Sequence, residues 1–257
     1  MQLLVSVRSA VEVAPALDGG ADIIDAKEPG RGSLGPVPPA TLAEIAALVP
    51  PERPLSIALG DLASSGEAVA AIAALELPAR PAPTYLKLGF AGVRSPEMIT
   101  RILASAVAAV SEKASAARVV AVAYADADRA STVGPDVILD LAGDARAAGV
   151  LLDTHTKDGI GLLGWLSPSA LAGWVALARR RGLLTALAGT LTLESLESVH
   201  AAGADIVGVR GAACEGGREG RVEASRVREL RQRLDGFRVG CQHGLGPGSP
   251  DGWRNAG

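Results

Sequence analysis

Short apolar segments alternate with longer amphipathic segments along almost the whole chain. Eight of the apolar segments are rich in β-branched residues and are predicted as strands, at residues 3–8, 22–28, 55–60, 85–90, 118–126, 149–155, 184–189 and 205–211. Continuously apolar strands are typical of a parallel sheet that is buried on both faces. Alanine-rich segments with helical periodicity lie between them, and several end at a glycine directly before the next strand, as helix C-caps do.

Eight strand–helix units in succession predict a (β/α)8 barrel, the TIM barrel, as a single domain over residues 1–235. The near-copies GGADII and AGADIV, one at each end of this region, indicate a repeated βα unit. A doubly wound open sheet is the alternative fold. Residues 236–257 lose both periodicities and are rich in glycine and proline, so they are predicted as a flexible C-terminal tail.

Composition narrows the possible partners. The 257 residues carry a formal net charge of -3, which does not favour binding to nucleic acid or to an anionic membrane. No apolar run approaches the roughly 18 residues of a transmembrane helix, and no signal peptide is predicted. The two cysteines, Cys214 and Cys241, and the three histidines lack metal-binding spacing. We therefore expect reduced thiols, a cytoplasmic location and no metal or cofactor. Barrel helices often associate, so a homo-oligomer is also expected.

Lysine is scarce, and its placement is the strongest sign of chemistry. The four lysines among 25 Lys and Arg residues are Lys27, Lys87, Lys113 and Lys157. In an arginine-rich chain, a retained lysine is a candidate for work that requires losing the proton, because a guanidinium stays protonated. Lys113 lies in an ordinary helical pattern. The other three lie at or near the carboxyl ends of predicted strands two, four and six, and they can converge on a barrel mouth, where active sites lie.

Two carboxylates accompany these lysines. Asp25 and Lys27 are two residues apart on one strand and face the same side. Asp153, His155 and Lys157 repeat this spacing if strand six stays extended. Burial and neighbouring ammonium groups both lower a lysine pKa, so one lysine could be neutral near pH 7 and form a Schiff base. The structural alternative is two internal salt bridges, Asp25–Lys27 and Asp153–Lys157.

The ends of strands seven and eight predict a phosphate site. The residues concerned are small, apart from one threonine and one arginine: Gly189, Thr190, Gly208, Arg210, Gly211 and Ala212. Small residues expose backbone N–H groups to an anion, and the corresponding loops bind phosphate in many TIM barrels. The alternative is that these glycines only turn the chain.

Three more polar residues are candidate substrate contacts. Asp61, Asp126 and His155 each lie at the end of a predicted strand and can reach a barrel mouth. Either aspartate would equally serve as an N-cap of the next helix, and His155 as a hydrogen-bonded histidine at the rim. Arg8, which ends strand one, is a further candidate phosphate ligand.

Several segments together resemble one enzyme family, the (5-formylfuran-3-yl)methyl phosphate synthases. The resemblance covers about residues 2–235 and rests on ADIIDAKEPGRGSLG, YLKLG, VAYADADR, LLDTHTKDG, ALAGTL and DIVGVRGAAC, in this order. It implies a TIM barrel related to class I aldolases that needs no metal. It also implies condensation of two glyceraldehyde 3-phosphate molecules into 4-(hydroxymethyl)-2-furancarboxaldehyde phosphate, with loss of phosphate and water, for the biosynthesis of methanofuran, a one-carbon carrier. The Ala- and Arg-rich composition indicates a bacterial member.

The resemblance also implies roles for individual residues. Lys27 of the D-x-K strand is implied as the Schiff-base lysine, and Lys87 of the LKxG strand as the proton acceptor. Asp25, Asp153 and Lys157 are implied as the remaining catalytic residues. From the residues alone, Lys157 is as good a nucleophile as Lys27. Two alternative functions stay open: a class I aldolase for another sugar phosphate, and a non-catalytic sugar-phosphate-binding barrel.

Overall fold

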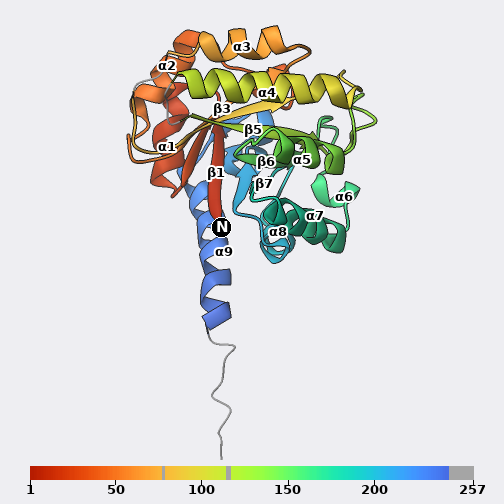
Figure 1. Ribbon diagram of the computed structural model, residues 1–257. Helices are drawn as coiled ribbons and strands as arrows, with labels where there is room; N and C mark the ends of the chain where they lie inside the picture. Colours follow the sequence, from red (N-terminus) through yellow and green to blue (C-terminus); the bar gives the residue numbers. More distant parts are fainter. Residues whose placement is uncertain (77–78, 114–116, 243–257) are drawn as a thin grey trace, which may run out of the picture.

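The computed structural model describes residues 1–76, 79–113 and 117–242. Within these residues, eight parallel strands close into a barrel in which the last strand pairs with the first (Figure 1). The strands are β1 (Gln2–Val7), β2 (Ile23–Ala26), β3 (Leu55–Asp61), β4 (Thr84–Gly89), β5 (Ala117–Tyr124), β6 (Gly149–Asp153), β7 (Leu184–Leu187) and β8 (Ile206–Val209). The predicted TIM barrel is confirmed. The open sheet is wrong, because an open sheet leaves its first and last strands unpaired with each other.

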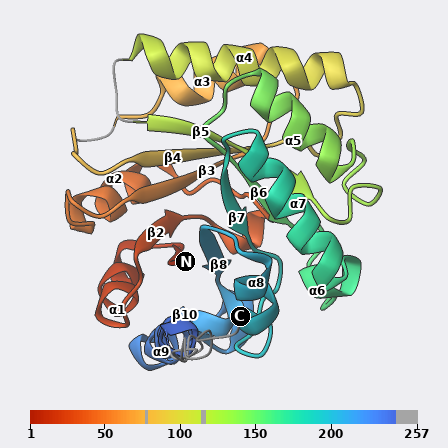
Figure 2. The same ribbon diagram turned by 60° about the horizontal axis from the view of Figure 1, so that its bottom comes forward.

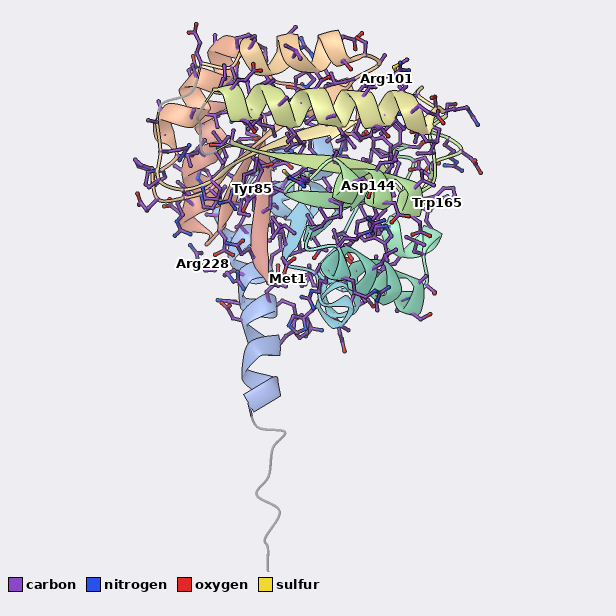
Figure 3. The ribbon with its side chains drawn as sticks, in the orientation of Figure 1. Met1, Tyr85, Arg101, Asp144, Trp165 and Arg228 are labelled. Carbon is purple, nitrogen blue, oxygen red and sulfur yellow. The ribbon has the colours of Figure 1, made fainter. Side chains whose placement is uncertain are left out.

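Helices cover the outside of the barrel (Figure 2). They are α1 (Val13–Asp18), α2 (Pro39–Leu48), α3 (Ser65–Ala73), α4 (Pro96–Glu112), α5 (Pro135–Asp144), α6 (Leu162–Trp165), α7 (Pro168–Arg180), α8 (Leu196–Ala202) and α9 (Ala224–Gln242). Charged side chains such as Arg101 and Asp144 lie on their outer faces (Figure 3). No helix in the described part of the chain is both long and apolar enough to cross a bilayer.

Helix α4 shows how the sequence specifies these elements. The Ser95 side chain accepts a hydrogen bond from the Met98 backbone N–H, which caps the first turn. Its buried residues recur at helical spacing and form one stripe: Ile99, Ile102, Leu103, Ala106 and Val110. The helix therefore packs this stripe against the outer face of the barrel and leaves its polar face in solvent.

The barrel interior changes character along its axis. Near the amino ends of the strands, inward-facing side chains such as Leu4, Tyr85, Val120 and Ile206 form an apolar cluster. One or two residues further along the same strands, the inward positions become polar, as at Ser6 on β1. Because strand side chains alternate between two faces, outward residues of the same strands pack against the helices. The polar end of the barrel is the carboxyl end, where TIM-barrel sites form.

A short hairpin between β8 and α9 was not predicted. Strands β9 (Cys214–Glu215) and β10 (Arg221–Val222) pair antiparallel around the 3₁₀ turn η4 (Gly217–Glu219). Two-residue strands are too short to leave a periodic pattern in the sequence. The hairpin matters because it carries η4 back to the mouth of the barrel, beside the turn that follows β8.

The predicted boundary of the C-terminal tail at residue 236 is wrong, because α9 continues through that position to Gln242. The helix is fixed by Val227, Leu230 and Leu234, which are buried in the core. Phe237 extends this stripe, with its ring centroid 4.8 Å from that of His200. This contact holds the helix past its glycine. The remainder of the predicted tail, residues 243–257, lies outside the described residues.

Lys113, the lysine expected to lie on an ordinary helix surface, binds the end of a neighbouring helix. Its ammonium donates to the carbonyl oxygens of Ile72, Ala73 and Leu75, at 2.9, 3.0 and 2.8 Å. Ile72 and Ala73 are the last residues of α3 and Leu75 follows the helix, and a cation is favourable at a helix C-terminus. We expect Lys113→Ala to lower the free energy of unfolding by about 1 kcal/mol. Lys113→Arg should retain most of this stabilisation, because it keeps a cation at the helix end. Denaturant titration measures both, and an alanine variant as stable as wild type would contradict this capping role.

Candidate active site

Three lysines and two aspartates meet at the carboxyl end of the barrel. Asp25 comes from β2, Lys87 from β4 and Asp153 from the last position of β6. Lys27 follows β2 directly, and Lys157 lies in the segment between β6 and α6. All five line one cavity of about 630 Å³. The structure therefore brings together every residue of the predicted catalytic group.

Each aspartate forms an ion pair with one lysine. Lys87 Nζ lies 2.6 Å from Asp25 Oδ1, and Lys157 Nζ lies 2.7 Å from Asp153 Oδ1. The alternative pair Asp25–Lys27 is wrong. Residues two apart on one strand lie about 7 Å apart, whereas alternate strands of a TIM barrel place their inward side chains in the same layer. Asp25 on β2 therefore meets the lysine of β4.

Both aspartates are held in their ionised form. Burial alone would raise the pKa of Asp25, but Lys87 and Lys27, with a hydrogen bond from the Ser6 hydroxyl at 2.7 Å, keep that pKa below its ordinary value. Burial likewise opposes ionisation of Asp153, and Lys157 and Lys27 lower its pKa. Two negative charges thus lie among three amines.

Lys27 is the amine left over from this pairing. It is 6% exposed, and with the described residues its side chain forms no hydrogen bond and no ion pair within 4.0 Å. Burial and the charges of Lys87 and Lys157 lower its pKa from 10.5 to about 7, against the attraction of Asp153 and Asp25. A large part of Lys27 is therefore a neutral amine near pH 7, the form that attacks a carbonyl.

Lys157 differs from Lys27 in its surroundings. Its ammonium is fixed by Asp153 and by a hydrogen bond to Thr154 Oγ1 at 3.0 Å. Its side chain is 15% exposed. Strand β6 ends at Asp153, so the extended spacing assumed for Lys157 is not kept. Lys157 reaches the cavity from the segment that follows the strand.

The turns that follow β7 and β8 form another wall of the same cavity. Gly189, Thr190, Gly208, Gly211 and Ala212 all line it. Gly189 adopts φ +109°, a conformation that favours glycine. A Cβ there would also lie 3.1 Å from the Thr154 backbone nitrogen, so this turn packs tightly against the end of β6. The small residues expected to bind phosphate are therefore beside the lysines.

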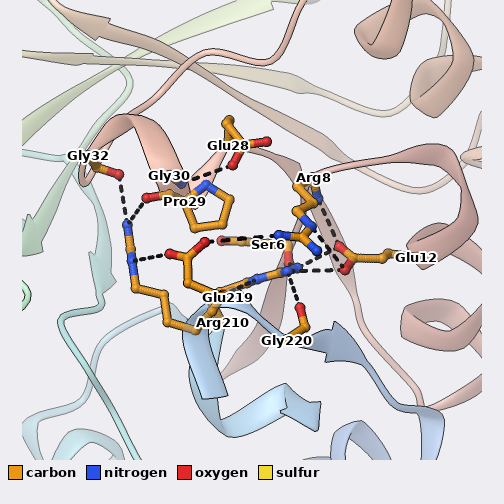
Figure 4. A network of polar contacts seen from close by, with 11 residues as sticks. Ser6, Arg8, Glu12, Glu28, Pro29, Gly30, Gly32, Arg210, Glu219 and Gly220 are labelled. Atoms are coloured by element: carbon orange, nitrogen blue, oxygen red, sulfur yellow. Dashed lines mark hydrogen bonds and ion pairs between the residues drawn. The ribbon is translucent and has the colours of Figure 1, made fainter. Parts of the chain in front are cut away.

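Arg210, predicted as a phosphate ligand, lines the cavity, but all five of its N–H groups are engaged within the protein (Figure 4). Nη1 donates to Ser6 O at 3.0 Å and to a Glu12 oxygen at 2.5 Å. Nη2 donates to the other Glu12 oxygen at 3.1 Å and to Gly220 O at 2.8 Å, and Nε to Arg218 O at 3.1 Å. Arg210 and Glu12 form a buried ion pair that fixes the turn after β8 against β1. The other arginine named as a candidate phosphate ligand, Arg8, directly follows β1. Its Nε lies 3.9 Å from Glu12 Oε1 and its Nη1 lies 4.0 Å from Glu219 Oε2, so two carboxylates already offset its charge.

Asp126 and His155 support the site without lining its cavity. The buried Asp126 carboxylate accepts hydrogen bonds from the backbone N–H groups of His155 and Thr156, at 2.6 and 2.8 Å. It therefore fixes the segment that carries Lys157. The His155 ring meets the Tyr124 ring edge-on, with centroids 5.1 Å apart. Both were predicted as substrate contacts; in the structure β6 ends before His155, and each Asp126 oxygen accepts one backbone donor.

Asp61 is also engaged by its neighbours and does not line the cavity. Its Oδ1 accepts the Tyr124 hydroxyl at 2.7 Å and the Ala91 backbone N–H at 2.9 Å. Gly89 makes this arrangement possible, because a Cβ there would collide with both Asp61 and Tyr124. Asp61, predicted as a substrate contact, instead joins the end of β3 to Tyr124 at the end of β5 in this structure.

Sequence reasoning missed Arg218, which lies in η4 and lines the cavity. Its only signal was a single arginine in the glycine-rich segment EGGREG. Sequence reasoning also missed Ser6, whose hydroxyl holds Asp25. No metal centre was expected, and in the described residues no three His, Cys, Asp or Glu side chains gather as a metal site requires.

Fold and site together define a class: a TIM-barrel enzyme whose site is a group of buried lysines at the carboxyl ends of the strands. The fold is similar to solved structures with little sequence identity. Phosphoribosyl anthranilate isomerase from Thermus thermophilus superposes with a TM-score of 0.60 at 17% identity, covering 92% of this chain and all of that one. For 3-hexulose-6-phosphate synthase from Salmonella typhimurium the TM-score is 0.61 at 18% identity, with 92% and 99% covered.

Sequence comparison identifies the family within this class. The family model for 4-HFC-P synthase matches residues 3–231. The (5-formylfuran-3-yl)methyl phosphate synthase of Methanothermobacter thermautotrophicus is 39% identical over 92% of this chain and the whole of its own length. That of Methanopyrus kandleri is 37% identical, over 91% of this chain and 98% of its own. The chain belongs to the 4-HFC-P synthase family of enzymes.

The pKa of Lys27 predicts an unusual dependence of stability on pH. With a folded pKa of about 7 against an ordinary 10.5, the folded protein binds fewer protons than the unfolded chain between these values. The cost of burying this amine is therefore present in full below pH 7 and declines as pH rises towards 10.5. We expect Lys27→Met to exceed wild type in stability at pH 6, and the difference to shrink by about 4 kcal/mol by pH 10.

Lys87→Met is the matched control for this measurement. It removes the same charge from the same cavity but leaves the buried Asp25 without its partner. It should therefore destabilise the protein, by about 3 kcal/mol or more, where Lys27→Met stabilises it. Urea denaturation of both variants between pH 6 and 10 tests the contrast. If the Lys27→Met difference does not vary with pH, the lowered pKa of Lys27 is wrong.

Proposed function

We propose that this protein condenses two molecules of glyceraldehyde 3-phosphate into 4-(hydroxymethyl)-2-furancarboxaldehyde phosphate, through an imine on Lys27, and so supplies the furan of methanofuran. One phosphate and two water molecules leave, which balances the atoms of the two trioses. The observation that carries this proposal is the unpaired, deprotonatable amine of Lys27 between two aspartate–lysine pairs. The names of the related synthases and the volume of the cavity, about 630 Å³, support it.

Lys27 begins the reaction as the nucleophile. One triose phosphate isomerises so that its carbonyl lies at the middle carbon, and the neutral Lys27 amine attacks that carbon. Loss of water gives a protonated imine, which serves as an electron sink for the neighbouring carbon. Lys27 suits this role because no carboxylate holds its proton, whereas Lys157 would first have to leave Asp153.

The two ion pairs serve as proton carriers. Lys87 becomes the base after passing its ammonium proton to Asp25, and it then removes the proton from the hydroxyl-bearing carbon next to the imine. Phosphate leaves from the carbon on the other side of the imine, and Lys157, held by Asp153, donates a proton to it.

The resulting enamine attacks the carbonyl at the middle carbon of the second triose phosphate, which has isomerised in the same way. This new carbon–carbon bond gives the branched skeleton of the product. The terminal hydroxyl of the second triose then attacks the imine carbon and closes the ring, the Lys27 amine is expelled, and loss of water gives the furan.

The phosphate of the imine-forming triose is assigned to the turns after β7 and β8. Backbone N–H groups of Gly189, Thr190, Gly211 and Ala212 are the proposed donors. This assignment follows the position at which TIM barrels commonly bind phosphate. It would hold the carbonyl of the substrate towards Lys27 across the same cavity, while its carbon chain lies over the apolar lower layer of the barrel.

Product formation and trapping test this proposal together. Purified protein incubated with glyceraldehyde 3-phosphate should develop the absorbance of a furan aldehyde. Borohydride should trap the substrate on the peptide that contains Lys27. Lys27→Arg keeps the charge but cannot form the imine, so turnover should be lost while Lys113→Arg, as the control, stays active.

Each competing assignment predicts a different result. A class I aldolase for another sugar phosphate would give a trapped lysine but no furan absorbance. A non-catalytic barrel would give neither. A label on Lys157 alone would show that the nucleophile is assigned to the wrong lysine, as would substantial activity in Lys27→Arg.

The rate of imine formation should follow the titration of Lys27. Because its pKa is about 7, the neutral fraction rises about tenfold from pH 6 to pH 8 and then levels off. An ordinary lysine would instead keep gaining reactivity beyond pH 9. Initial rates of borohydride trapping with dihydroxyacetone phosphate measure this. Lys157→Met removes a neighbouring positive charge, which raises the pKa of Lys27 and should move the rise to higher pH. A profile that still climbs steeply at pH 9 in wild type would exclude the proposed pKa.

A further inference from the structure

Arg218 crosses the mouth of the barrel from one wall of the cavity to another. Its backbone lies in η4, against the turn after β8, where a Cβ on Gly211 would be 3.5 Å from the Arg218 nitrogen. Its side chain extends to the segment that follows Lys27, where Nη2 donates to the carbonyl oxygens of Pro29 and Gly32, at 3.1 and 2.7 Å. The guanidinium is therefore fixed between the expected phosphate turn and the segment next to the nucleophile.

Most of the hydrogen-bonding capacity of this guanidinium is unused. Its Nε and Nη1 groups form no hydrogen bond with any described residue. The nearest carboxylate, on Glu219, is 4.0 Å from Nε, too far for a hydrogen bond. Three N–H donors are thus available on a side chain that lines the cavity and is 24% exposed. Arg210, whose five donors are all engaged, is the opposite case.

The charge around Arg218 also favours an anion. Each aspartate at the strand ends is neutralised by one lysine, and Lys27 is largely a neutral amine near pH 7. Arg218 lines the same cavity, and no carboxylate lies within hydrogen-bond distance of its guanidinium. Its charge is therefore available to an anion beside the lysines. The other charged residues that line the cavity are Arg210, which is paired with Glu12, and Glu194, Arg226 and Glu229.

We propose that Arg218 binds the phosphate of the second triose phosphate, the molecule whose carbonyl accepts the enamine. This inference rests on the proposed function, which brings two phosphate groups into one cavity. The turns after β7 and β8 accommodate one of them. The free Nη1 group of Arg218, with two N–H donors and the charge of the guanidinium, offers the other phosphate charge-assisted hydrogen bonds on the side of Lys27.

A purely structural role leaves this arrangement unexplained. Joining η4 to residues 29–32 uses only Nη2. A structural tie would satisfy the remaining donors, as the protein does at Arg210. Arg218 instead keeps three free donors and a charge with no hydrogen-bonded carboxylate, and a phosphate would compensate for both features.

The test separates the first triose phosphate from the second. Imine formation on Lys27 requires only the first molecule, so borohydride trapping with dihydroxyacetone phosphate reports on that molecule. Furan formation from glyceraldehyde 3-phosphate requires both. We would measure both readouts for wild type, Arg218→Gln and Arg218→Lys. Arg221→Gln, an exposed arginine in β10 of the same hairpin that does not line the cavity, is the matched control.

In Arg218→Gln we expect the KM for furan formation to rise about tenfold or more, with trapping of Lys27 by dihydroxyacetone phosphate within about twofold of wild type. Arg218→Lys, which keeps the charge but not the guanidinium donors, should be intermediate, and Arg221→Gln should match wild type in both. Circular dichroism and thermal unfolding verify that the variants are folded. If Arg218→Gln does not fold, the same comparison is made with Arg218→Lys.

Three results would overturn the inference. Unchanged furan kinetics in Arg218→Gln would show that no phosphate depends on this side chain. A parallel loss of trapping and of furan formation would show that Arg218 serves the first triose or only the shape of the site. A wild-type protein that forms no furan would overturn the proposed function and this inference together, whereas the first two results leave the proposed function intact.

Discussion

The arrangement of this site follows from one imbalance: three buried amines share two buried carboxylates. Each carboxylate can neutralise one ammonium, and Asp25 and Asp153 do so at 2.6 and 2.7 Å. The third amine can remain in the cavity at low cost only by giving up its proton, because an uncompensated charge in a buried site is costly. Reactivity at Lys27 is therefore a consequence of the pairing around it. Nothing in the immediate sequence of Lys27 would lower its pKa without the barrel.

The barrel creates this imbalance by fixing side chains from different strands in one layer. β2, β4 and β6 supply the charged residues, and the intervening strands supply smaller or apolar side chains. Supporting contacts keep the layer in place: Ser6 holds Asp25, while Asp126 holds the segment that carries Lys157. Removing the Ser6 hydroxyl would take away one of the contacts that keep the pKa of Asp25 low.

Local pattern in the sequence predicted the strands and the convergence of the lysines, because both depend on periodicity and on the equivalence of strand ends in a barrel. It did not predict the partners. Asp25 pairs with Lys87, 62 positions away in the chain and not with Lys27 on its own strand. Arg210 was interpreted as a phosphate ligand because nothing in its neighbourhood reveals Glu12, which lies 198 residues away and binds it. Hydrogen bonds between distant segments form only when the barrel closes, and the local sequence around each residue carries no information about these partners.

Arg210 and Arg218 illustrate how surroundings decide the use of a side chain, and they also bear on how the proposed reaction could proceed. Before substrate binds, the positive charges of the cavity favour the neutral Lys27 amine, the form that attacks a carbonyl. Each phosphate that binds brings negative charge, so the same cavity then favours a cation at Lys27. In the proposed mechanism that cation is the protonated imine, the intermediate that must be stabilised. The ammonium groups of Lys87 and Lys157 lower the pKa of Lys27 in the empty site. The same positive charges attract the substrate phosphates, which in turn stabilise the protonated imine.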